Sequence, residues 1–139
     1  MAGLERFIDA QKDVWEVALS ELEGGRKQTH WMWFIFPQLA GLGRSHRATY
    51  YGIHDLDEAR DYLAHPVLAA RLEAATQAVL RHGTRSADAI MGSVDAMKLR
   101  SCATLFLAAG GGRAFQDVLD TFFAGQPCAA TQQLLDKKP

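Results

Sequence analysis

The sequence predicts an all-α protein, a compact multihelical single domain of about six to eight helices over residues 1–139. Apolar residues recur at intervals of three and four through most of the chain, as they do on helices buried along one face. Serine, aspartate and proline stand where such segments begin, and glycines stand where they end. Alternating apolar and polar residues with tight hairpin signals are absent. A chain of 139 residues is long enough to bury one core without disulfides or a metal.

The first half of the chain begins with one long predicted helix over residues 4–22. Apolar residues there follow a nearly helical period, and Gly24-Gly25 supply a stop. The aromatic segment at residues 31–36 is too short to classify by its period, but Pro37 ends whatever forms there. A glycine-bearing loop follows and separates this segment from the remaining helices.

The later helices are predicted from their start residues. Ser45, Ser86 and Ser93 are suited to begin helices, and Asp55 opens a capping-box-like sequence. Pro66 suits the first position of a helix, because its missing N–H would have no partner there. The expected elements are a short helix from Ser45 to Gly52, helices over 55–63, 66–82, 93–109 and 115–124, a short piece over 86–92, and a last turn or two over 131–135.

The composition is that of an ordinary globular protein, and it narrows the choice of partners. Hydrophobic residues make up 48% of the chain, charged residues make up 22%, and the net charge is -1. Such a balance argues against disorder. It also argues against an extended nucleic-acid surface, which needs a basic face.

The same sequence indicates a cytoplasmic protein without membrane contact. Charges fall within residues 1–13, where a secretion signal needs an unbroken apolar run, and the apolar stretch at 31–36 is too short to cross a bilayer. Cys102 and Cys128 stand outside any metal-ligand spacing and fit a reducing compartment. We therefore expect no metal site and no cofactor.

Residues 25–45 are the most informative part of the chain. They carry two of the three tryptophans and a histidine between basic residues, with glycines that let the backbone approach a ligand closely. Trp31 and Trp33 point in different directions on any regular backbone. We therefore expect one of them to pack in the core and the other to line a cavity.

This segment contains the run His30-Trp31-Met32-Trp33-Phe34-Ile35-Phe36-Pro37-Gln38-Leu39 and continues with Gly41-Leu42-Gly43 and Ser45. The run resembles the signature of a small bacterial family catalogued as a domain of unknown function. Three further segments agree with that family: Phe7 with Ala10-Gln11, Glu58-Ala59 through Tyr62-Leu63 to His65-Pro66, and Asp95 through Lys98 and Ser101 to Thr104-Leu105-Phe106. The resemblance spans nearly the whole chain and implies a multihelical all-α fold with no established activity. A calpastatin label that the family sometimes carries does not apply, since nothing here looks like a disordered protease inhibitor.

The chain departs from the family pattern at three positions. Ala69 stands where glycine is expected before Arg71-Leu72, Cys102 replaces a small hydroxyl residue, and Cys128 stands where aspartate is usual. These departures leave the predicted fold intact. They exclude both cysteines from the predicted functional positions.

A polar stripe is expected on the helix that begins at Ser93. Asp95, Lys98 and Ser101 lie three residues apart, which places them along one face with Cys102 alongside. Apolar neighbours nearly surround the stripe, so we expect part of it to be buried and to offer a carboxylate, an ammonium and a hydroxyl to one ligand. The alternative is an intrahelical ion pair beside a solvated serine.

The basic segment offers both a proton carrier and an anion cradle. His30 is a candidate general acid or base, because an imidazole exchanges protons near neutral pH. A buried histidine bonded to a backbone carbonyl is the alternative. Arg26, Lys27, Arg44 and Arg47 are candidates for an anion cradle, although charged residues also simply solvate a surface.

These observations predict a small-molecule site where residues 27–45 meet residues 95–104. We expect a small anionic ligand, nucleotide-like or phosphorylated, and the simplest enzymatic activity would be that of a hydrolase or transferase on an N-glycosidic or ADP-ribose-type compound. The candidate catalytic residues are His30, Asp95 and Lys98. The candidate ligand-binding residues are Arg26, Lys27, Trp31, Trp33, Gln38, Arg44, Ser45, Ser101 and Thr104.

The alternative function is a non-catalytic module in which the aromatic segment docks another protein, or a second copy of the chain to form a homodimer. It predicts an exposed apolar patch that includes Trp31 or Trp33, rimmed by arginines, on a surface without a deep cavity. The small-molecule site predicts instead a concave pocket between the two segments.

Overall fold

Ten helices make up the part of the chain that the structure, a computed structural model, describes, namely residues 3–137. They are α1 (Glu5–Lys12), α2 (Trp15–Glu23), α3 (Met32–Ile35), α4 (His46–Tyr50), α5 (Leu56–Ala64), α6 (Pro66–Leu80), α7 (Ala87–Met91), α8 (Ser93–Ala108), α9 (Arg113–Phe123) and α10 (Ala129–Asp136). Within these residues the extended pairing is an isolated parallel bridge between Leu39 and Ile53. The predicted all-α class is confirmed, and the predicted count of helices is too low.

The additional helices lie in the first quarter of the chain. The single helix predicted over residues 4–22 is wrong: the chain turns at Asp13 and Val14, where the Val14 N–H donates to Gln11 O at 3.1 Å, and α1 and α2 are separate. The buried Gln11 side chain donates to Phe34 O at 2.7 Å, so α1 is held against α3 while α2 packs on α6. The apolar period continues through the break because both helices face the same core. The aromatic segment adds the short α3.

The predicted helix starts at Ser45, Asp55 and Ser86 are confirmed by their hydrogen bonds, whereas α8 begins at Ser93 without a side-chain cap. The side-chain oxygens of Ser45, Asp55 and Ser86 accept from the backbone N–H three residues ahead at 3.0, 2.9 and 3.0 Å. Pro66 is the first residue of α6, and His65 Nδ1 accepts two backbone N–H groups at the same helix end. Helix α10 is longer than the turn or two expected. Side-chain capping therefore marks the starts of α4, α5, α6 and α7.

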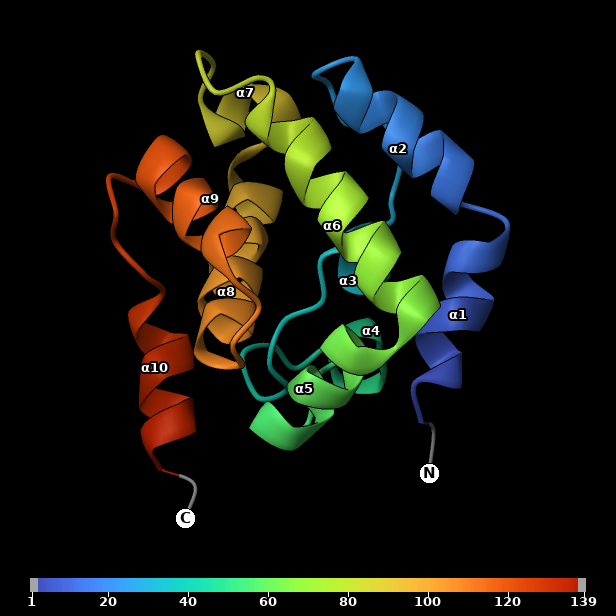
Figure 1. Ribbon diagram of the computed structural model, residues 1–139, viewed down its shortest axis with the longest axis vertical. Helices are drawn as coiled ribbons and strands as arrows, with labels where there is room; N and C mark the ends of the chain where they lie inside the picture. The colour runs from blue at the N-terminus through green and yellow to red at the C-terminus, as the bar shows by residue number, and fades with distance from the viewer. Residues whose placement is uncertain (1–2, 138–139) are drawn as a thin grey trace.

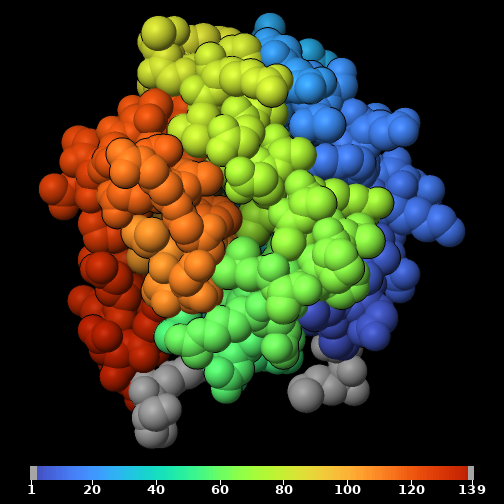
Figure 2. Space-filling model, viewed as in Figure 1, coloured from blue at the N-terminus to red at the C-terminus, as the bar shows by residue number. Residues whose placement is uncertain are grey.

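Helix α6 crosses the front of the molecule in Figure 1, with α2 beside it on one side and α9 on the other. Helix α8 packs against α9, α7, α5 and α10. The short α3 lies behind α6 and contacts both α6 and α1. Figure 2 shows the side chains of α5, α6 and α9 covering this face, so α3 is hidden from this side.

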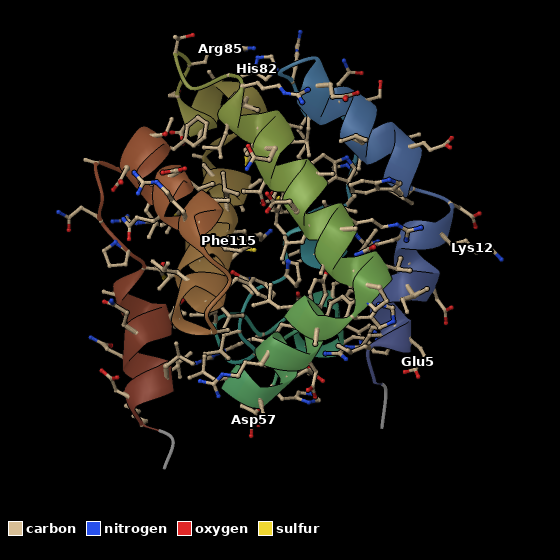
Figure 3. All side chains as sticks on the ribbon, in the orientation of Figure 1. Glu5, Lys12, Asp57, His82, Arg85 and Phe115 are labelled. Atoms are coloured by element: carbon tan, nitrogen blue, oxygen red, sulfur yellow. The ribbon has the colours of Figure 1, made fainter. Side chains whose placement is uncertain are left out.

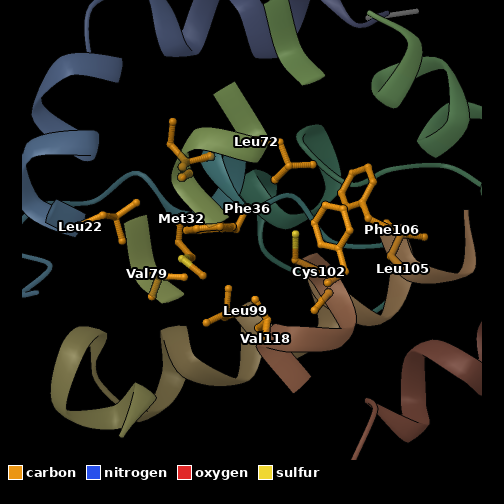
Figure 4. Close-up of a cluster of buried hydrophobic side chains, with 14 of the residues drawn as sticks. Leu22, Met32, Phe36, Leu72, Val79, Leu99, Cys102, Leu105, Phe106 and Val118 are labelled. Carbon is orange, nitrogen blue, oxygen red and sulfur yellow. The ribbon is translucent and has the colours of Figure 1, made fainter. Parts of the chain in front are cut away.

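One cluster of buried side chains forms the core. It draws residues from α1, α2, α3, α5, α6, α7, α8 and α9. Figure 4 shows Met32 of α3 in this cluster together with Phe36, the residue directly after α3. Leu72 and Val79 of α6 and Leu99 of α8 lie in the same cluster. The middle of the aromatic segment is therefore core, and this anchors the residues on either side of it.

A buried arginine joins the start of α1 to α4 and α5. The Arg6 guanidinium donates to Gly3 O at 2.7 Å, to Tyr50 O at 2.8 Å and to Gly52 O at 2.8 Å, and it pairs with Glu58 at 2.9 Å. Gly52 fits there because a Cβ at this position would lie 2.6 Å from that of Ala40. Arg6 thereby fixes the loop and short helix that follow the aromatic segment.

Arg6→Met is expected to lower the free energy of unfolding by about 3–5 kcal/mol, because it leaves Glu58 and backbone carbonyls buried without their partner. Urea denaturation measures this change. Arg60→Met is the matched control, since the Arg60 pair with Asp57 is exposed and such a pair contributes about 0–1 kcal/mol. Equal effects of the two substitutions would contradict the role given to Arg6.

Candidate ligand-binding site

The turn after α2 brings the backbone of Lys27 into contact with α7. Gly25 has φ +74°, a conformation that favours glycine, and its carbonyl accepts from Arg85 at 2.7 Å. His82 Nε2 lies 2.8 Å from Glu23 O, and Figure 3 shows His82 and Arg85 together at this end of the molecule. The Lys27 N–H then donates to a carbonyl of α7, that of Ile90, at 2.8 Å.

The Glu21 carboxylate organises the segment that follows. It accepts from the N–H groups of Gln28 and Thr29 at 2.8 and 3.0 Å, from Thr29 Oγ1 at 2.7 Å, and from Trp31 Nε1 at 2.9 Å. Burial acts to raise the pKa of Glu21, but these hydrogen bonds together lower that pKa from its ordinary value of 4.5 to about 2. The segment from 28 to 31 is thus ordered around one anion.

Two lysines share one carboxylate where this segment meets α8. Lys27 Nζ lies 2.9 Å from Asp95 Oδ2, and Lys98 Nζ lies 3.4 Å from Asp95 Oδ1. The exposed fractions of these side chains are 6% for Lys27, 16% for Lys98 and 19% for Asp95. Lys27 also donates to Thr29 O. The group therefore carries one more positive than negative charge in a largely buried place.

Each of these lysines also lies over an indole ring. Lys98 Nζ is 3.5 Å from the ring centroid of Trp33, and Lys27 Nζ is 4.8 Å from that of Trp31. Trp31 is fully buried, whereas Trp33 is partly exposed. Trp31 therefore packs in the core, as predicted of one tryptophan, and both rings line a cavity rather than Trp33 alone.

Two neighbouring cavities open at this point. The inner pocket has a volume of about 130 Å³ and is lined by Lys27, His30, Trp31, Met32, Trp33, Arg47, Asp95 and Lys98. The outer pocket has a volume of about 400 Å³ and is lined by Trp33, Gln38, Leu42, Gly43, Arg44, Ser45, Ala48, Val94, Met97, Lys98, Ser101, Cys128 and Ala130. Trp33 and Lys98 line both, so the two pockets meet at this pair.

Most of the predicted site residues come together in these pockets. The inner pocket brings together Lys27, His30, Trp31, Trp33, Asp95 and Lys98. The outer pocket adds Gln38, Arg44, Ser45 and Ser101. Arg47, one of the basic residues of the expected cradle, lines the inner pocket.

Two predicted ligand-binding residues lie outside both pockets. Arg26 is exposed and lines neither. Thr104 Oγ1 donates to Arg100 O at 2.8 Å and accepts from the Cys128 N–H at 2.9 Å, so its hydroxyl is engaged between α8 and the start of α10. The structure therefore places Thr104 in a structural role.

His30 is exposed at the edge of the inner pocket. The alternative of a buried histidine bonded to a carbonyl is therefore wrong. Its side chain is therefore open to solvent at the pocket.

Seven residues of the outer pocket are not among the predicted site residues: Leu42, Gly43, Ala48, Val94, Met97, Cys128 and Ala130. Val94 and Met97 share the helical face of Lys98 and Ser101, and the spacing of three to four residues along α8 could have shown this. The departure from the family pattern excluded Cys128 from the predicted functional positions, yet it lines the outer pocket, because the packing of α10 brings it to α8.

Within residues 3–137 the structure shows neither a cluster of side chains suited to a metal ion nor a membrane-spanning helix. No group of three or more histidine, cysteine, aspartate or glutamate side chains is placed there to hold a metal ion. None of the described helices has both the length and the apolar character needed to span a membrane.

Fold and site together define a multihelical protein with a pocket lined by lysine and tryptophan. Residues 1–135 match the family described as "Protein of unknown function (DUF1810)", and the chain belongs to this family. The resemblance seen in the sequence is thereby confirmed. The chain is also similar to the crystal structure of the conserved hypothetical protein Rv1873 from Mycobacterium tuberculosis, with 42% identity, coverage of 97% of each chain and a TM-score of 0.95. It matches none of the curated proteins with which it was compared.

Glu21→Gln is expected to weaken folding at pH 7 by about 1–3 kcal/mol, because four donors lose a charged acceptor. The pKa of Glu21 is lower in the folded than in the unfolded chain, so its contribution is present above pH 4.5 and is lost as the pH falls towards about 2. Urea denaturation between pH 2 and 7 should show a smaller pH dependence for Glu21→Gln than for wild type. Glu23→Gln, an exposed residue of the same helix, is the control, and a curve for Glu21→Gln parallel to wild type would contradict the assignment.

Proposed function

We propose that this protein binds a small phosphorylated, nucleotide-like ligand, with a phosphate in the inner pocket and a planar organic group in the outer pocket. The sharing of Asp95 between Lys27 and Lys98 is the observation that carries the proposal. We propose the cytoplasm as its location, since Cys102 and Cys128 are both free thiols.

The charge balance of the inner pocket favours an anion. A positive charge without a counter-ion is costly to bury, and a bound anion removes that cost. Lys27 and Lys98 each retain donors beyond the one directed at Asp95, because an ammonium has three. Arg47 adds a further cation to the lining. A volume of about 130 Å³ suits one compact charged group and excludes a whole nucleotide.

The outer pocket supplies what the rest of such a ligand needs. Its volume of about 400 Å³ falls in the range of small-molecule sites, roughly 300–1,000 Å³. Trp33 offers an aromatic surface between the two pockets, and Met97 adds apolar lining. Arg44 and Ser45 provide polar contacts for a second phosphate or a sugar.

The geometry of the inner pocket supports a different role for each of the catalytic candidates His30, Asp95 and Lys98. Both oxygens of Asp95 already accept from ammonium groups, which makes Asp95 a positioning residue. For cleavage of an N-glycosidic or ADP-ribose-type compound, His30 is the candidate proton acceptor, because it faces the inner pocket from an exposed position. Lys98 would then stabilise developing negative charge.

A second candidate function is self-association through the rim of the outer pocket. Val94 and Met97 are 67% and 69% exposed, although both are large and apolar. Such residues beside Trp33 form the kind of patch through which copies of a chain associate.

Lys98→Gln is expected to weaken the binding of ADP-ribose about tenfold or more, because a charge-assisted hydrogen bond is lost from a largely buried position. Calorimetry measures the Kd, and the ligand should raise the Tm of the wild-type protein because it binds the folded state. AMP and ribose 5-phosphate, tested in parallel, separate the contribution of the base from that of the phosphate. Lys12→Gln, at an exposed lysine of α1 labelled in Figure 3, is the matched control and should bind like wild type. The proposal fails with an unchanged wild-type Tm for all three compounds, or with equal Kd values for Lys98→Gln and wild type.

Met97→Glu is expected to keep the chain monomeric at concentrations where wild type self-associates, because a charge then lies in the apolar rim. Sedimentation velocity over a range of concentrations measures this. A wild-type chain that stays monomeric at millimolar concentration would exclude self-association.

A further inference from the structure

The outer pocket contains a thiol that the proposed ligand site does not use. Cys128 is half-buried and is the residue immediately before α10, a helix of 8 residues. Its Sγ lies 3.3 Å from Ser101 Oγ of α8, and its backbone N–H donates to Thr104 Oγ1 at 2.9 Å. The sulfur is therefore held at one place on the pocket wall.

A buried hydroxyl, that of Thr131, belongs to the same helix start as this sulfur. Thr131 is fully buried, and among residues 3–137 its Oγ1 makes no hydrogen bond of ordinary geometry. This hydroxyl and the backbone N–H groups of Ala130 and Thr131, at the start of α10, lie near enough to Cys128 to lower the pKa of its thiol. A buried donor without an acceptor is costly, and an anionic sulfur removes that cost.

Ser101 can serve either state of the thiol. Its hydroxyl has a single proton, which can go to Met97 O at 3.1 Å or to Cys128 Sγ at 3.3 Å. Beside a thiol, it can donate to the carbonyl and accept from the S–H group; beside a thiolate, it can turn to donate to the sulfur. Burial acts to raise the pKa of Cys128, but the donors of Ser101, Thr131 and Ala130 together lower that pKa from its ordinary value of 9.0.

We infer that Cys128 is a site of covalent modification, whose thiolate attacks small carbon electrophiles that carry a negative charge. Arg44 and Lys98 line the same pocket and draw anions to it. With iodoacetate, the sulfur lone pair forms a carbon–sulfur bond while the carbon–iodine bond breaks. Iodide leaves with the bonding pair, and the thiol proton goes to water. The inference does not rest on the proposed ligand function, although both use the outer pocket.

Alkylation rates at pH 7 test this inference, measured by peptide mass spectrometry on the folded full chain with iodoacetate and with iodoacetamide. Cys102 is the internal control, since it is buried and burial raises its pKa well above the ordinary value. We expect Cys128 to react with iodoacetate about tenfold or more faster than Cys102, with a pH midpoint below 9.0. Thr131→Val should slow both reagents, because it removes one donor to the thiolate.

Arg44→Gln separates charge attraction from thiolate formation. It should slow iodoacetate by about threefold or more while leaving the iodoacetamide rate nearly unchanged, because only iodoacetate carries a charge. Arg44 is exposed, so this variant is expected to fold normally. The inference is overturned if Cys128 and Cys102 react equally slowly, or if the pH midpoint lies at or above 9.0. Equal slowing of both reagents by Arg44→Gln would also overturn it.

Discussion

The Asp95 carboxylate joins two parts of the chain that are far apart in sequence. It accepts from Lys27, on the segment after α2, and from Lys98, one turn further along α8. Without it, two largely buried ammonium groups would lie together with no counter-ion, and their repulsion grows as water is removed. The pairing still leaves one positive charge uncompensated. The interaction that holds the two segments together therefore also leaves a net positive charge at their pocket, on which the proposed anion binding rests.

The helices could be predicted where local chemistry decides them. Ser45, Asp55 and Ser86 accept from N–H groups within their own turns, so their capping role is visible in the sequence. The break at Asp13–Val14 could not be predicted, because no glycine or proline marks it and the contact of Gln11 with Phe34 O decides it. Tertiary packing sets the path there while the apolar period continues unchanged.

The candidate site, too, could be predicted from the sequence only where local spacing decides which side chains meet. The spacing of Asp95 and Lys98 along one helix is enough to predict that their side chains lie together, and the two groups do pair. The sequence also predicts that Thr104 binds the ligand, but packing of the residues before α10 engages its hydroxyl with the Cys128 N–H. Cys128 itself reaches the outer pocket only because α10 packs on α8. Contacts between distant segments thus decide which polar groups remain available to a ligand.

The most direct measurement of anion binding follows the Nζ resonances of the five lysines, Lys12, Lys27, Lys98, Lys137 and Lys138, by NMR during a titration with inorganic phosphate. The account predicts that the Lys27 and Lys98 resonances shift and saturate together, with one Kd, while the exposed Lys12 shows at most a weak linear drift. If all the lysines drift alike, or if Lys27 and Lys98 stay unchanged while phosphate is raised to tens of millimolar, the paired lysines are purely structural and the account is contradicted.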